Sequence, residues 1–180
     1  MKQIILHNKV FVPFIDREKI EQTVQKMALE IYEKYKHTTP VFVGVLNGVI
    51  LFFSDFLKNY PGRCEIAFIQ LSSYRCMSSS GEVKVILDWP IDIYGRDVVI
   101  FEDIIDTGNT LEKLYEMVCT QVVKSVKIAT LFLKPEVFKS DLNIDFIGMR
   151  IPNKFFIGYG LDLDGIGRNY PDIYQLKDEA

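Results

Sequence analysis

Three acidic residues stand beside a run of small polar residues in the middle of the chain. The acids are Glu102, Asp103 and Asp106, and the run that follows them is Thr107-Gly108-Asn109-Thr110. A helix start made of such residues binds an anion through its free N–H groups. Neighbouring carboxylates accept hydrogen bonds from a sugar diol or help to hold a divalent cation. The segment therefore indicates a site for a sugar phosphate.

Each of these residues also has an ordinary structural explanation. Acids and glycine often end strands, and Asn and Thr are common turn and cap residues. Three acids within five positions, joined to this helix start, favour a functional site over that explanation. The segment has neither the Gly-x-Gly-x-x-Gly loop of dinucleotide-binding proteins nor the Gly-Lys-Ser/Thr of a P-loop, which excludes those two enzyme classes.

Alternating strands and helices must position these residues. Apolar residues recur at helical spacing from Asp16 to Lys36, and Ile50–Lys58 and Thr110 to about Val123 also indicate helices. Strands are expected at Val41–Val45, Glu65–Leu71, Val83–Leu87, Val98–Phe101 and Val126–Leu133. This alternation predicts an α/β fold with a parallel sheet, in which ligands bind at the carboxyl ends of the strands. Two long loops, 72–81 and 158–171, are further candidates for function.

Length and composition set the class of protein. The chain has 180 residues, 48% hydrophobic and 25% charged, which predicts one folded domain over 1–180. The net charge of -3 and the lack of a basic run count against nucleic acid. The longest uncharged apolar stretch, Val41–Phe53, is too short to cross a membrane, and the N-terminus lacks a signal-peptide core. We therefore expect a cytoplasmic protein whose three cysteines are reduced, with no zinc site.

The acidic segment resembles the phosphoribosyl-pyrophosphate (PRPP) signature of the type I phosphoribosyltransferases. Four further segments resemble the hypoxanthine-guanine branch in the same order, so that the likeness extends from about Val41 to Pro171. They are Val43–Gly48, Ser72–Tyr74, Leu131–Lys134 and Ile151–Asp162. The resemblance implies the type I phosphoribosyltransferase fold, a mainly parallel twisted sheet flanked by helices, with a small hood built from the N- and C-terminal segments.

The resemblance also implies roles for the acidic segment. Glu102 and Asp103 would hold the ribose hydroxyls and Mg²⁺. Asp106 would lie near the purine N7 as the general base, a role suited to a carboxylate beside an oxocarbenium-like transition state. Asp106 and Thr107-Gly108-Asn109-Thr110 would hold the 5'-phosphate.

Residues of the later segments would bind the purine. Lys134 would read the exocyclic oxygen of a 6-oxopurine, although from the sequence alone a solvated lysine is an equal reading. Phe155 would stack on the base, with Phe156 beside it, and Lys154 would help to orient the base and the phosphate. Asp162 is expected near the purine and as a Mg²⁺ ligand.

The pyrophosphate would lie against Leu46-Asn47-Gly48 and Arg168. Family members commonly have a lysine before this glycine, where the present chain has Asn47, so that backbone N–H donors remain and the side-chain cation is lost. Ser73 and Tyr74 match the tip of a mobile loop that closes over the substrate and excludes water. Arg75-Cys76-Met77 replace the smaller residues often found after it.

The reaction implied is Mg²⁺-dependent transfer of 5-phosphoribosyl from PRPP to N9 of hypoxanthine or guanine, giving IMP or GMP and pyrophosphate, in purine salvage. The sequence leaves the choice among hypoxanthine, guanine and xanthine open. The resemblance also leads us to expect a homodimer or homotetramer.

Two other functions share some of these features. A phosphotransfer receiver domain also has an acidic pair and a Lys-Pro, but the stretch from Asp103 to Lys134 is too short for two strand–helix units. Some phosphoribosyltransferase-like proteins bind RNA as regulators. The net charge counts against RNA, whereas Lys134 and Phe155 count for catalysis.

Overall fold

The computed structural model describes residues 2–73, 83–85 and 92–177. The chain begins with a hairpin and then alternates strands and helices before ending in short strands. The elements in chain order are β1 (Ile4–Leu6), β2 (Lys9–Ile15), α1 (Arg17–Tyr35), β3 (Val41–Leu46), α2 (Ile50–Asn59), β4 (Glu65–Ser73), β5 (Val83–Val85), β6 (Asp97–Ile105), α3 (Asn109–Cys119), β7 (Ser125–Leu133), β8 (Phe146–Arg150), β9 (Phe156–Ile157) and β10 (Ile173–Leu176).

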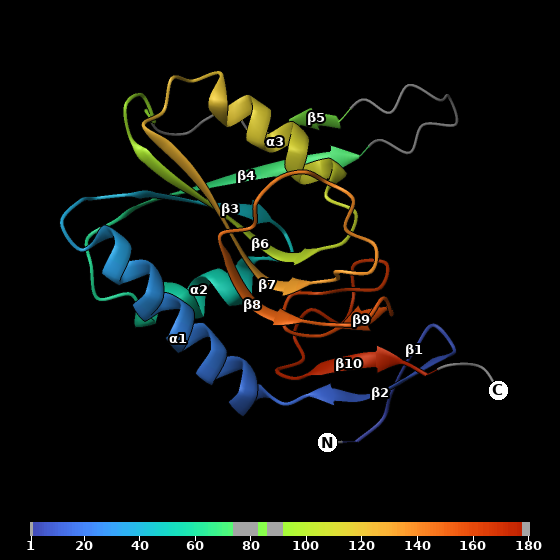
Figure 1. The fold of residues 1–180 in the computed structure, drawn as a ribbon. Coiled ribbons are helices and arrows are strands. Elements are labelled where there is room, and N and C mark those ends of the chain that lie inside the picture. The colour runs from blue at the N-terminus through green and yellow to red at the C-terminus, as the bar shows by residue number, and fades with distance from the viewer. Residues whose placement is uncertain (1, 74–82, 86–91, 178–180) are drawn as a thin grey trace.

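A six-stranded sheet with the order β5-β4-β3-β6-β7-β8 forms the body of the molecule. Every neighbouring pair is parallel except β4 with β5, which confirms the predicted α/β class. Helices α1 and α2 cover one face of the sheet and α3 covers the other (Figure 1). The middle strands are buried on both faces, which is why their sequences are nearly continuous apolar runs.

Helix α1 forms where the sequence predicted it. Its N-cap, Asp16, accepts a hydrogen bond from the backbone N–H of Lys19 at 2.8 Å, which satisfies one of the free donors of the first turn. The residues at helical spacing form one buried stripe that packs against α2 and β8. They are Ile20, Val24, Met27, Ala28, Ile31 and Tyr35.

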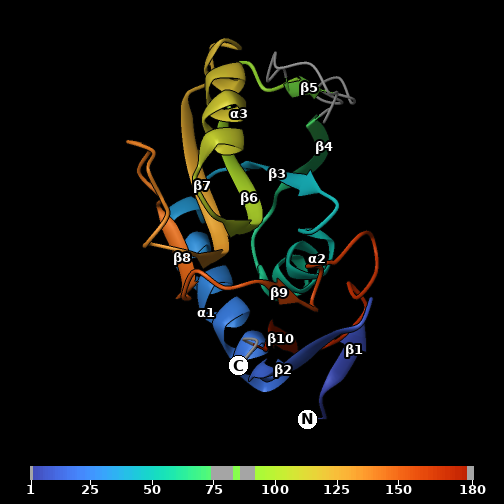
Figure 2. The same cartoon turned by 90° about the vertical axis from the view of Figure 1, so that its right-hand side faces the viewer.

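A second, antiparallel sheet has the order β1-β2-β10-β9. It joins the two ends of the chain at one end of the molecule (Figure 2), as the predicted hood of N- and C-terminal segments requires. We use the name hood for these four strands and for the connection from Gly158 to Asp172. Phe11, Ile157, Leu163 and Tyr174 form a small apolar core of its own inside the hood.

Several boundaries differ from those expected. Strand β6 runs on to Ile105, because residues 102–105 continue to pair with β7. Helix α3 ends at Cys119, four residues early, because the chain turns back through Val122, which has a left-handed φ of 53°. Strand β5 covers Val83–Val85, and the rest of the expected 83–87 strand lies outside the described residues. Strand β8 was not predicted from the sequence.

The helices of the described ranges include none that is both long and apolar enough to cross a membrane. Cys64 and Cys119 are free cysteines, and Cys76 lies outside the described residues. In the same ranges, no group of three or more His, Cys, Asp and Glu side chains forms a metal centre.

Candidate active site

The site opens where β3 and β6 separate. Their last paired residues are Gly44 and Phe101, whereas β6 stays paired with β7 as far as Ile105. Glu102 and Asp103 are the next two residues of β6, directly beyond the last residue that pairs with β3. Parallel sheets bind ligands at such a divergence of strands.

The carboxyl end of β6 leads into a hollow of about 200 Å³. Its wall is Glu102 and the backbone and side chains of residues 104–111, so it contains the whole predicted phosphate segment. Gly108 is the N-cap of α3 and has a φ of 91°. A Cβ there would lie 2.8 Å from the Cβ of Ser140 and 2.9 Å from Cε2 of Phe138. The turn thus needs glycine, and the N-terminus of α3 faces the hollow with no side-chain cap.

Asp106 and Lys134 form an ion pair of 2.7 Å between Oδ1 and Nζ. They follow the adjacent parallel strands β6 and β7, whose ends are joined by a hydrogen bond from the Lys134 N–H to the Ile105 carbonyl at 3.0 Å. The Lys134 side chain is 9% exposed, and its ammonium lies 5.8 Å from the ring centroid of Phe156. The Asp106 side chain is 52% exposed. A buried cation and an accessible carboxylate thus meet at one point of the site.

The ionised forms of Glu102 and Asp103 are unfavourable in the ligand-free protein. Burial, and then the neighbouring Asp103, raise the pKa of Glu102 well above its usual range. Burial also raises the pKa of Asp103 to about 6, although backbone N–H groups and the charge of Arg168 act in the opposite direction. A bound cation would stabilise both ionised carboxylates.

The loop after β3 passes directly over Asp103. The peptide bond between Leu46 and Asn47 is cis, and Asn47 is exposed. A Cβ on Gly48 would lie only 1.7 Å from Oδ2 of Asp103, so the missing side chain makes room for the carboxylate. The predicted pyrophosphate loop and the predicted ribose-binding acid are therefore in contact.

Asp162 and Arg168 lie on the hood connection and bind each other. Arg168 Nη2 lies 2.7 Å from Oδ1 of Asp162, and its Nη1 donates to the Gly160 carbonyl at 2.6 Å. The second oxygen of Asp162 accepts from the N–H of Gly165 at 2.7 Å. Both carboxylate oxygens of Asp162 are therefore engaged within the connection.

The two predicted aromatic residues differ in their surroundings. Phe155 is 44% exposed and lies 6.3 Å, centroid to centroid, from Phe11. Phe156 is 4% exposed and belongs to the main core. Its ring therefore lies inside the molecule, beside the ammonium of Lys134, instead of facing outward. Lys154 is exposed.

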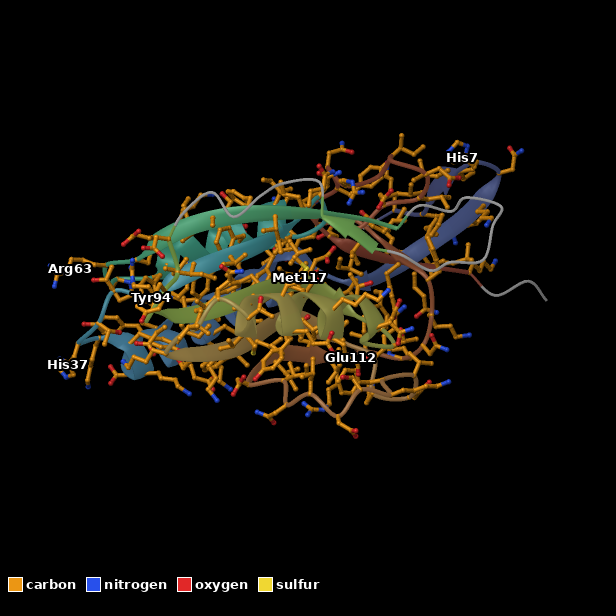
Figure 3. All side chains as sticks on the ribbon, turned by 90° about the horizontal axis from the view of Figure 1, so that it is seen from above. His7, His37, Arg63, Tyr94, Glu112 and Met117 are labelled. Atoms are coloured by element: carbon orange, nitrogen blue, oxygen red, sulfur yellow. The ribbon has the colours of Figure 1, made fainter. Side chains whose placement is uncertain are left out.

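The predicted mobile loop lies largely outside the described residues. Ser73 is the last residue of β4, and Tyr74 and the loop behind it lie outside the described residues. His7 and His37 are exposed and lie near opposite ends of the molecule (Figure 3), His37 at the end of the sheet away from the site. Asp106, whose side chain is 52% exposed, is an accessible acid or base in the part of the site that the structure describes.

Sequence reasoning missed two residues beside the site. The hydroxyl of Tyr159 donates to Oδ2 of Asp55 at 2.8 Å, across 104 positions of the chain. Neither residue has a distinctive neighbour in sequence, apart from the two glycines that flank Tyr159. A contact over such a separation is visible only in the fold.

Comparison with known proteins agrees with this geometry. The phosphoribosyl transferase domain family matches residues 15–164. A protein named hypoxanthine-guanine phosphoribosyltransferase from Bacillus subtilis is 42% identical over 91% of each chain, and one of the same name from Aquifex aeolicus is 36% identical over 99% of this chain and 100% of its own. A crystal structure of a hypoxanthine phosphoribosyltransferase from Staphylococcus aureus superposes with a TM-score of 0.87, at 35% identity and 98% coverage of both chains.

The acid pair at the end of β6 and the helix start behind it suit a sugar phosphate, and the family match makes the protein a phosphoribosyltransferase. The chain belongs to the phosphoribosyltransferase family. Within that family it groups with the hypoxanthine-guanine phosphoribosyltransferases.

Proposed function

We propose that the protein transfers the 5-phosphoribosyl group from PRPP to N9 of a 6-oxopurine, hypoxanthine or guanine, and releases pyrophosphate. The observation that carries the choice of base is the contact between Asp106 and Lys134. The exocyclic O6 and the N7 of a 6-oxopurine are neighbouring atoms on one edge of the ring. A cation and a carboxylate 2.7 Å apart match those two atoms, one as donor to O6 and the other as acceptor from N7–H.

The proposed chemistry uses these groups in one displacement. The lone pair of N9 forms the bond to C1' of the ribose while the bond from C1' to the pyrophosphate oxygen breaks. The proton of N7 passes to Asp106, and the electron pair of the broken bond leaves with pyrophosphate. Lys134 would stabilise negative charge on O6 as the proton leaves, and Asp106 would stabilise positive charge at C1'.

The hollow at the start of α3 would hold the 5'-phosphate through the N–H groups of residues 107–110. The Leu46-Asn47-Gly48 loop and Arg168 would hold the pyrophosphate. Glu102 and Asp103 would hold the ribose diol. Phe155, which is partly exposed, is suited to stack on the base, and Lys154 to orient base and phosphate; Phe156 would contribute by holding Lys134 in place.

We also propose that Mg²⁺ binds with PRPP. The carboxyl group of Glu102 is buried, that of Asp103 is partly buried, and both have raised pKa values. They form a donor set that fits Mg²⁺, because this ion takes one or two carboxylates and completes its shell with substrate oxygens. When bound, Mg²⁺ would neutralise charge on the leaving pyrophosphate. Glu102 and Asp103 would hold it, and Asp162 would contribute if its contact with Arg168 opens.

The partners proposed are therefore PRPP, hypoxanthine or guanine, IMP or GMP, and pyrophosphate, in the cytoplasm. The mobile-loop role of Ser73 and Tyr74 and the homodimer or homotetramer remain predictions. Light scattering during size-exclusion chromatography measures the oligomeric state directly.

An ultraviolet assay tests the proposal. Purified protein, PRPP and Mg²⁺ are mixed with hypoxanthine, guanine, xanthine or adenine, with and without a chelator. We expect nucleotide from the 6-oxopurines, none from adenine, and no reaction with chelator. PRPP binding without turnover of any base would favour a regulatory binding protein instead.

A further inference from the structure

Tyr159 occupies an unusual place in the hood. It follows Gly158 and precedes Gly160, and the φ angles of the three residues are 98°, 45° and 99°. A left-handed backbone is unfavourable for a bulky residue such as tyrosine, which indicates that surrounding contacts hold it there. The side chain is buried, with 6% of its surface exposed.

The partner of Tyr159 lies on α2, in the body of the molecule. Its hydroxyl donates to Oδ2 of Asp55 at 2.8 Å, while Oδ1 of Asp55 binds Lys58 at 2.8 Å. Burial, and then this hydrogen bond, raise the pKa of Tyr159, so it remains the donor. The bond joins the hood to α2, which lies beside β9 and the connection that follows it (Figure 2).

Helix α2 begins directly after the Leu46-Asn47-Gly48 loop. Its first turn is bonded to that loop, since the N–H of Ile50 donates to the Asn47 carbonyl at 3.3 Å. A hydrogen bond that fixes α2 against the hood therefore also fixes the loop against the hood.

The other side of the loop touches the residue next to Tyr159. A Cβ on Gly160 would lie 1.9 Å from the carbonyl oxygen of Gly48. Gly48 in turn lies against Asp103, and the Gly160 carbonyl accepts from Arg168. The loop thus lies between Asp103 and the hood turn. The same turn is bonded to α2 through Tyr159.

We propose that Tyr159 is a positioning residue for the pyrophosphate end of the PRPP site, acting through Asp55 to hold the turn 158–160 against the loop 46–48. This inference rests on the proposed function. Loss of the hydroxyl lets the turn and the loop move apart. PRPP then binds more weakly, whereas the purine, which is bound at the ends of β6 and β7, is unaffected.

The test compares Tyr159→Phe with Tyr174→Phe. Tyr174 is a matched control, because it is also a hood tyrosine, 6% exposed, whose hydroxyl binds an aspartate, but its partner Asp172 lies within the hood. Calorimetry measures the Kd of PRPP with Mg²⁺, kinetics give the KM for hypoxanthine, and hydrogen exchange follows residues 46–53.

For Tyr159→Phe we expect the Kd of PRPP to rise about fivefold to tenfold, less than the full effect of a lost hydrogen bond to a carboxylate, because Tyr159 acts on PRPP only through the loop. Exchange in residues 46–53 should become faster, and the KM for hypoxanthine should stay the same. Tyr174→Phe should leave all three unchanged. Asp55→Asn retains an acceptor oxygen and should bind PRPP as the wild type does, whereas Asp55→Ala should match Tyr159→Phe, and the double variant should add nothing.

If the wild type binds PRPP and Tyr159→Phe binds it with the same Kd, this inference is overturned and the proposed function is not. An equal rise in Tyr174→Phe, or additive effects of Asp55→Ala and Tyr159→Phe, would also overturn this inference. A wild-type protein that does not bind PRPP would overturn the proposed function, and this inference with it.

Discussion

At the scale of single residues, the ion pair of Asp106 and Lys134 brings a buried cation and an accessible carboxylate together in the site. The sequence identified both residues, but on separate grounds: Asp106 from the acidic cluster, and Lys134 only through the resemblance. Two adjacent parallel strands that end at the same level bring them to 2.7 Å. The engagement of both Asp162 oxygens could not be predicted from the sequence, because it depends on the turns of the hood connection.

Replacing Lys134 should impair purine use selectively. In Lys134→Gln the charge that would stabilise O6 is lost, and we expect the KM for hypoxanthine to rise roughly tenfold to 100-fold, the effect of losing a hydrogen bond to a charged group. The Kd of PRPP should change less than about threefold, because Lys134 is proposed to contact the base and not PRPP. Lys127→Gln is the control, because Lys127 lies on β7, the strand that Lys134 follows, and pairs with Asp145 at 2.7 Å away from the site. Equal effects of the two substitutions would contradict the role of Lys134.

The raised pKa of Asp103 predicts two opposite pH effects. Below pH about 6 the carboxyl binds a proton, so the affinity for PRPP with Mg²⁺ should fall as the pH decreases through that value. The stability of the ligand-free protein should change in the other direction and rise as the pH decreases. Its folded state binds the proton more tightly than the unfolded chain does, so the cost of ionised Asp103 is present above pH 6 and disappears as the pH falls.

Thermal unfolding and PRPP titrations at pH 5.5 and 7.5 measure both effects. The comparison with Asp103→Asn separates Asp103 from the other carboxyl groups. The Tm advantage of Asp103→Asn over the wild type should be larger at pH 7.5 than at pH 5.5. A difference that does not depend on pH would mean that Asp103 is not the titrating group.

At the scale of elements, the sequence was most informative where neighbours along the chain determine the structure. Helix α1, its cap and its buried stripe, and strands β3, β4, β6 and β7 lie close to their predicted positions. The strands of the hood were implied only by the resemblance. β2 pairs with β10 near the other end of the chain, and no local pattern encodes that pairing.

The contact between the hood turn and the loop after β3 predicts a severe effect of Gly160→Ala. Its φ of 99° disfavours alanine by about 1–2 kcal/mol, and the added Cβ would collide with the Gly48 carbonyl oxygen. We expect a loss of stability beyond that backbone cost, together with weaker PRPP binding. Urea unfolding and calorimetry measure the two.

Gly165→Ala is the control for backbone strain. Its φ is 87°, but a Cβ there meets nothing within 4 Å, so it carries the backbone cost alone. If Gly165→Ala and Gly160→Ala were equally destabilising and bound PRPP equally well, the close approach of hood and loop would have no energetic importance.

At the scale of the whole molecule, we propose that residues 1–180 fold as one domain. Hood residues Phe156, Tyr159, Leu161 and Ile173 belong to the same apolar cluster as α1 and α2. The N–H of Arg17, at the start of α1, also donates to Asp172 of the hood at 2.9 Å. The two sheets therefore share a core.

Urea unfolding should accordingly be a single transition. Far-ultraviolet circular dichroism reports the whole chain, and hydrogen exchange of β2 and β10 reports the hood. Because the shared core couples them, both probes should give the same midpoint. A hood that exchanges at lower urea than the six-stranded sheet would show that it is a separate unit.

The central claim is that Asp106 removes the purine proton during transfer. It is tested most directly by the turnover and PRPP affinity of Asp106→Asn, measured beside the wild type with hypoxanthine and Mg²⁺. The asparagine occupies the same space but takes up no proton, so kcat should fall by about 10²–10⁴-fold while the Kd of PRPP changes little. Turnover equal to that of the wild type would contradict the assignment of Asp106 as the base.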